Sequence, residues 1–173
     1  MSSSLYDAIV PTYLQILGGT KKWLGKAEAF AVDRGLPEAA IMEAVLAPDM
    51  FPFNRQVRGS AMHAHGGIAG ARAGLFTPDL SPAPTSFSGL HARLAEALAY
   101  LEGLTPADMN DLTGKPMTFA IGERKLAFTA DNFLLSFSQP NFFFHTTTAY
   151  AILRHLGVEV GKLDYLGRLR LSE

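Results

Sequence analysis

The sequence predicts a mainly α protein, a four-helix bundle with a small β-hairpin between the third and fourth long helices. Apolar residues recur at three- and four-residue steps in four long segments, and glycine and proline separate these segments. Strict alternation of apolar residues replaces the helical period at residues 116–129. A chain of 173 residues is long enough to bury one core, so residues 1–173 are expected to form a single bundle domain.

The first long helix is expected to begin after Ser4, a residue typical of N-caps, with Asp7 at the position of a capping-box partner. Apolar residues continue on one face as far as Ala31, and Gly35 is well placed to end the helix. Pro11 lies inside this run and predicts a bend, so a division of the helix into two pieces stays open.

The second long helix is predicted from about Phe53 to Ala73, after a short helix over residues 37–46. Alanine and glycine dominate this second helix. Each glycine in a helix interior costs about 1 kcal/mol relative to alanine. So many small residues indicate that another helix, or a ligand, approaches this helix closely.

The third and fourth long helices follow segments that break the helical pattern. Residues 75–85 contain three prolines and predict a surface loop, after which Ser86 or Ser88 caps the third helix. Residues 116–129 alternate around Gly122 and predict the β-hairpin. Asp131 is expected to cap the fourth helix, which runs to about His155.

Composition excludes several classes of function. The net charge is −1 and the 15 basic residues are scattered, so no basic stripe predicts nucleic-acid binding. There is no cysteine, which excludes disulfides, zinc–thiolate sites and cysteine nucleophiles. Ser136 and Ser138 stand in no glycine elbow, so the sequence does not indicate a serine hydrolase.

The expected environment is the cytoplasm. The N-terminal segment lacks a charged region followed by an apolar one, and no run of about 18 apolar residues predicts a membrane span. Hydrophobic residues make up 48% of the chain and charged residues 18%. Such a low share of charge leaves little surface for solvation, so we expect a second subunit to cover apolar surface in a homodimer.

Polar residues on the apolar faces of the second and fourth helices are the candidates for a site. At about 100° per residue, Asn141 and Thr148 fall on the apolar stripe of the fourth helix and His145 lies on its border. The complete stripe is Leu134, Phe137, Asn141, Phe144, Thr148, Ala151 and Ile152. On the second helix only one of His63 and His65 can face inward, and the stripe places His63 there.

These residues permit two interpretations. His63 and His145 together can hold a divalent metal with an open position, or transfer protons near neutral pH, in a small-molecule site completed by Asn141 and Thr148. Alternatively, each histidine bonds to a neighbouring carbonyl and fills the bundle. Because the pair follows no recognised spacing motif, the second interpretation is favoured over a ligand site.

The run from Pro140 to Gly167, the segment 47–52, and Gln56-Val57 followed by His63 resemble an uncharacterised bacterial family of unknown function in the DinB/YfiT-like superfamily. The resemblance implies a four-helix bundle that is often dimeric. In the wider superfamily a metal is held by one histidine of the second helix and two of an HxxxH motif on the last helix.

The resemblance places His63 at the second-helix ligand and His145 at the second histidine of HxxxH, with zinc or nickel as the implied metal. Asn141 stands where the first histidine of that motif would be. Two functions therefore stay open. One is a degenerate metal-dependent enzyme with a small-molecule pocket, similar to thiol transferases or hydrolases. The other is a non-catalytic dimeric binding or scaffold protein, whose polar core residues are structural.

Overall fold

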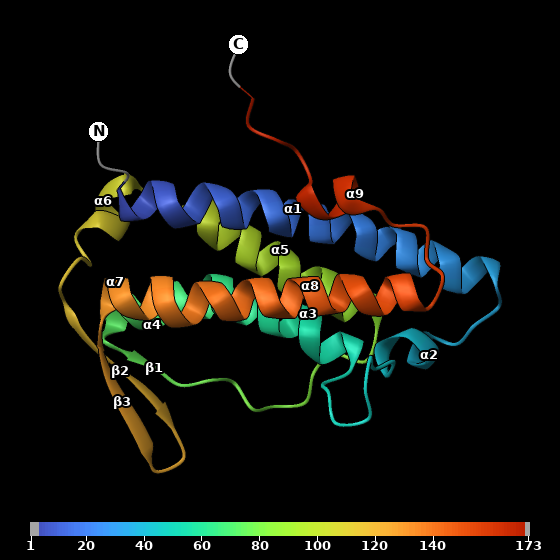
Figure 1. Cartoon of the computed structure of the whole chain (residues 1–173), viewed down its shortest axis with the longest axis horizontal. Helices are drawn as coiled ribbons and strands as arrows, with labels where there is room; N and C mark the ends of the chain where they lie inside the picture. The colour runs from blue at the N-terminus through green and yellow to red at the C-terminus, as the bar shows by residue number, and fades with distance from the viewer. Residues whose placement is uncertain (1–3, 172–173) are drawn as a thin grey trace.

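The computed structural model describes residues 4–171 and has the predicted architecture, a bundle of four long helices with a small sheet at one end (Figure 1). Residues 1–3, the start of the segment that lacks the pattern of a secretory signal, lie outside this range. The helical segments are α1 (Leu5–Asp33), α3 (Phe53–Ala61), η1 (Met62–Gly66), α4 (Gly67–Ala73), α5 (Phe87–Glu102), α7 (Ala130–Phe133), η2 (Leu134–Ser138) and α8 (Gln139–His155). The second long helix is α3–η1–α4 and the fourth is α7–η2–α8, each with one π-helical turn.

Helix α1 is one continuous helix, although the sequence left a division into two pieces open. The predicted capping box is present: the Ser4 hydroxyl accepts from the Asp7 amide, and the Asp7 carboxylate accepts from the Ser4 amide. Pro11 lies within the helix. Packing explains the glycine at position 19, because a Cβ there would lie 2.8 Å from the carbonyl oxygen of Asp164. That carbonyl belongs to α9 (Lys162–Leu166), a short helix that rests on α1 and that the sequence did not predict.

The predicted hairpin is formed by β2 (Pro116–Ile121) and β3 (Arg124–Thr129), which pair antiparallel. Gly122 turns the chain between them with φ +54°. A third strand, β1 (Leu75–Phe76), pairs parallel with β2 and replaces the start of the expected loop. The sheet projects from one end of the bundle (Figure 1), and Phe76, Phe119 and Phe128 attach it to the aromatic residues of α7 and η2.

The start of the fourth helix differs from the prediction by two residues. Its N-cap is Thr129, whereas Asp131 lies inside α7 and accepts a hydrogen bond from the Gly114 amide at 3.0 Å. Asp131 therefore fastens the fourth helix to the connector that precedes β2, and it does not cap the helix. Ser86 caps α5 as expected, with its hydroxyl accepting from the Gly89 amide.

Two further short helices, α2 (Glu38–Met42) and α6 (Pro106–Asn110), lie in the connections. One cluster of buried apolar residues runs through all four long helices, so the core is shared by the whole bundle. None of the helices in residues 4–171 is both long and apolar enough to cross a membrane.

Candidate functional site

His63 lies in the π turn η1 with 4% of its surface exposed. Its Nδ1 is 3.3 Å from the hydroxyl of Ser138, the last residue of the π turn η2. The same hydroxyl donates to the His63 carbonyl at 3.1 Å. Since its single proton is used there, the Ser138 oxygen is left to accept from Nδ1–H, which assigns the proton of the His63 ring to Nδ1.

His145 is fixed in the same way by Gln56 of α3. The Gln56 Nε2 donates to the Phe51 carbonyl at 3.0 Å, so its Oε1 must face the His145 Nδ1, 2.8 Å away. An amide oxygen can only accept, and His145 is therefore protonated on Nδ1. Within residues 4–171, the Nε2 atoms of His63 and His145 have no hydrogen-bond partner.

The two imidazoles face each other across the interface between the second and fourth helices. Their ring centroids are 5.7 Å apart and their planes differ by 19°. Burial and, to a smaller extent, the neighbouring His145 lower the pKa of His63 to about 3. Burial also lowers the pKa of His145 to about 4. Both rings are thus neutral at physiological pH and present a nitrogen lone pair at Nε2, which makes them acceptors rather than proton donors.

Two glycines of the second helix allow this close approach. A Cβ on Gly59 would lie 2.7 Å from Cγ of His145, and a Cβ on Gly67 would overlap the Ser138 hydroxyl. The prediction that another element approaches the glycine-rich helix closely is therefore confirmed. The approaching groups are the side chains of His145 and Ser138.

Tyr13 of α1 lies beside Ser138, at the edge of the polar centre formed by Gln56, His63, Ser138 and His145. Its ring stacks on Phe142 with centroids 4.1 Å apart, and its buried hydroxyl has no hydrogen-bond partner in residues 4–171. Burial raises the pKa of Tyr13, and the nearby Ser138 hydroxyl opposes part of this rise. Tyr13 is therefore a neutral donor beside Ser138.

The predicted stripe of the fourth helix is wrong by one residue just after η2, whereas Thr148 and Ile152 farther along are buried as predicted. Phe144 is 55% exposed, whereas Phe142 is fully buried. A π turn contains one residue more than an α turn, so the positions that directly follow it move forward by one. This shift turns His145 from the border of the stripe to its inner side. Pro140, where a kink was expected, is the second residue after the π turn.

Asn141 and Thr148 are not joined to the two histidines by any hydrogen bond within the described residues. The Asn141 Nδ2 donates back to the Phe137 carbonyl of its own helix at 2.7 Å, and within residues 4–171 no group donates to its Oδ1. Thr148 is 7% exposed, and its hydroxyl has no hydrogen bond in residues 4–171. Their role in a site stays a prediction.

Gln56 and Ser138 are the residues of this centre that sequence reasoning missed. Gln56 lies on the predicted inner stripe of the second helix, and this position could have identified it as a buried polar residue of the site. Ser138 is fully buried and stands four residues before Phe142, on the same face, but this relation is visible only once the π turn is known.

The centre offers fewer strong donors than the implied metal requires. Catalytic zinc sites use three protein ligands, and two imidazoles sharing a metal would have centroids about 5–6 Å apart. The separation of 5.7 Å meets this condition. However, residues 4–171 contain no group of three histidine, cysteine, aspartate or glutamate side chains placed to hold an ion. The donor set is one strong ligand short, so it does not fit a resident zinc or nickel ion.

Comparisons with known proteins agree on the fold. A family model described as a domain of unknown function (DUF1993) matches residues 5–166. A solved structure described as a DinB family member protein from Shewanella denitrificans is 33% identical, with a TM-score of 0.82. The alignment covers 98% of this chain and 95% of that chain. No curated protein matches.

Proposed function

Given that this chain belongs to the DUF1993 family of domains of unknown function and has a DinB-like fold, we propose that it binds a small molecule at the His63–His145 pair. The observation that carries the proposal is the unused Nε2 of each ring. Both rings are held by their Nδ1 atoms, to Ser138 and Gln56, so no hydrogen bond within residues 4–171 uses either Nε2 lone pair.

The chemistry of the pair indicates the class of ligand. Neutral imidazoles accept hydrogen bonds, so a matching ligand carries O–H or N–H groups. Phe76 and Phe137 flank His63, with ring centroids 5.8 and 6.1 Å away, which favours an apolar or aromatic body. With pKa values of about 3 and 4, neither ring is a good general base near pH 7. Binding is therefore better supported than acid–base catalysis.

The second candidate is a binding or scaffold protein in which the pair is a structural joint. The contacts of Gly59 with His145 and of Gly67 with Ser138 favour it, because they already fill the interface between the helices.

The homodimer and the absence of nucleic-acid partners stay predictions. Sedimentation equilibrium of the purified chain measures the first, and titration with duplex DNA measures the second.

Nuclear magnetic resonance of the ¹⁵N-histidine-labelled protein tests the proposal with phenol as the probe. Before addition, His63 and His145 should show the Nδ1–H tautomer with an unprotonated Nε2. Phenol should then shift both Nε2 signals together, because its hydroxyl donates to these atoms. His91, which is 3.4 Å from Glu28 on another face, is the internal control and should not respond. Unchanged His63 and His145 signals would refute phenol-type binding and favour the structural joint.

Elemental analysis tests the implied metal independently. The protein purified without chelator is compared with the double variant His63→Ala, His145→Ala. With two strong ligands, we expect well under one zinc or nickel ion per chain in both. A near-stoichiometric ion that the variant loses would show that Asn141 or a water completes the site, and that a metal-dependent reaction should be sought.

A further inference from the structure

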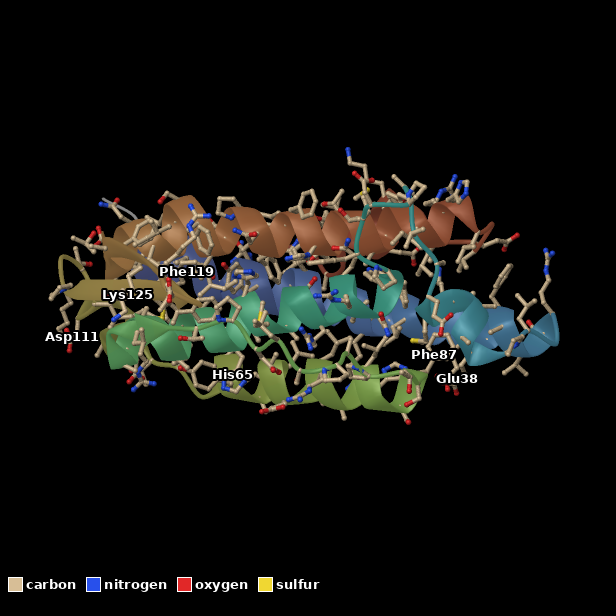
Figure 2. The ribbon with its side chains drawn as sticks, turned by 90° about the horizontal axis from the view of Figure 1, so that it is seen from below. Glu38, His65, Phe87, Asp111, Phe119 and Lys125 are labelled. Atoms are coloured by element: carbon tan, nitrogen blue, oxygen red, sulfur yellow. The ribbon has the colours of Figure 1, made fainter. Side chains whose placement is uncertain are left out.

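A cavity lined by charged and apolar side chains lies on the opposite side of the second helix from the His63–His145 pair. It has a volume of about 210 Å³ and is formed by α3, η1 and α5 together with Asp79 of the connector 77–86. The connector runs beneath the second helix in Figure 1. Figure 2 labels His65 between the second helix and α5, beside this cavity.

The most buried charged residue that lines the cavity is Arg58. Arg58 is 8% exposed, and its nitrogens donate to the carbonyls of Ser81 and, at 2.8 Å, of Asp79. No carboxylate of residues 4–171 lies within salt-bridge distance of it. A buried cation held only by neutral carbonyls keeps its full charge toward the cavity, where an anionic group would complete its environment.

Negative charge stands at the rim of the same cavity. Asp79 accepts a hydrogen bond from the Ser81 amide at 2.9 Å, and no cationic side chain of residues 4–171 is within salt-bridge distance. Glu96 is 3.4 Å from Arg93 and 3.8 Å from His65. Two guanidinium groups and two carboxylates therefore line one small space, without net charge from these four groups.

The remaining wall is apolar. Ala61, Met62 and Ala97 separate the charged groups, and Ala97 is 1% exposed. A dry cavity of about 150 Å³ can hold one benzene molecule. A space of about 210 Å³ is therefore suited to a compact molecule of about eight non-hydrogen atoms.

We propose that this cavity binds a small zwitterion, an α-amino acid with a short aliphatic side chain. The ligand carboxylate meets Arg58 and Arg93, the ammonium group meets Asp79 and Glu96, and the side chain packs on the apolar wall. A ligand of one sign would leave two of the four charged groups facing a like charge, whereas a zwitterion complements both pairs. The site shares no residue with the His63–His145 pair, so it stands independently of the function proposed above.

Isothermal titration calorimetry of the full chain with three matched probes tests this assignment. The probes are L-leucine, 4-methylpentanoate, which lacks the ammonium group, and 3-methylbutylamine, which lacks the carboxylate. L-leucine should bind at least about fivefold more tightly than either, because each analogue leaves one charged pair unsatisfied. Glycine, L-alanine and L-valine complete the series. If none of the four amino acids binds below about 10 mM, or if an analogue binds as tightly as L-leucine, the proposal is wrong.

Variants locate the binding. Asp79→Asn with Glu96→Gln should weaken L-leucine binding by at least about fivefold and leave 4-methylpentanoate binding equal or tighter. The side chains of Asp79 and Glu96 are exposed, so this double variant should keep the fold. A separate variant, Ala97→Leu, should abolish binding by filling the cavity. Glu102→Gln, at the end of the same helix and outside the cavity, is the matched control. Binding that survives both the charge variant and Ala97→Leu would place the ligand elsewhere and overturn the assignment.

Discussion

A single methyl group at position 67 should push the second and fourth helices apart at the polar centre. In Gly67→Ala the new Cβ overlaps the Ser138 hydroxyl, and Ser138 Cβ is only 3.4 Å away. Overpacking of this kind costs about 1–3 kcal/mol, while the helix propensity of alanine returns about 1 kcal/mol. Gly25→Ala is the control, because no atom lies within 4 Å of the added Cβ. The two variants should differ by about 1–3 kcal/mol in the free energy of unfolding.

Ser138→Ala shows whether the hydroxyl is the cause. Alone, it removes the hydrogen bonds to His63 and should cost about 1–3 kcal/mol. Combined with Gly67→Ala, it also removes the overlapping atom, so the double variant should be more stable than the sum of the single effects by about 1 kcal/mol or more. Urea unfolding followed by circular dichroism measures all four free energies. Strict additivity would refute the close approach of Ser138 to Gly67.

Three further results are expected. In the unfolded chain His63 and His145 are protonated below about pH 6.5, whereas in the folded protein they stay neutral down to about pH 3 and 4. As the pH falls from 7 to 5, the free energy of unfolding should therefore decrease by up to about 1.4 kcal/mol per pH unit for each histidine, as measured by urea unfolding. A flat profile would contradict the burial of both rings. Phe142→Ala should cost about 3–5 kcal/mol whereas Phe144→Ala stays within about 0.5 kcal/mol, and the reverse order in thermal unfolding would restore the unshifted stripe. Ser4→Ala should lower stability by about 1 kcal/mol through loss of the capping box, and an unchanged melting temperature would show that the end of α1 is frayed in solution.

The four long helices and the hairpin were predictable because their signals are local. Helical periodicity, the Ser4 cap and alternation around Gly122 each depend on residues within a few positions of one another. Strand β1 and helix α9 were missed for the opposite reason. β1 has two residues and exists through its pairing with β2, more than 40 positions away, and α9 is held by the close approach at Gly19.

The candidate site was predictable in part. Because His63 and His65 are two positions apart on one helix, the sequence could state that only one faces inward, and His63 does. The hydrogen-bond partners of His63 and His145 could not be predicted from the sequence. Ser138 is 75 positions from His63, and Gln56 is 89 positions from His145, so no spacing rule links them.

The π turn η2 explains why this site exists where it does. Pro140 has no amide hydrogen, so the fourth helix must lose one backbone hydrogen bond there in any geometry. An extra residue just before Pro140 therefore costs less than it would elsewhere in the helix. With uninterrupted α geometry, Asn141 and Phe144 would face the core and His145 would remain at the border. The inserted residue buries Phe142 in their place and brings His145 opposite His63, so a local defect in one helix creates the pairing on which the proposed binding depends.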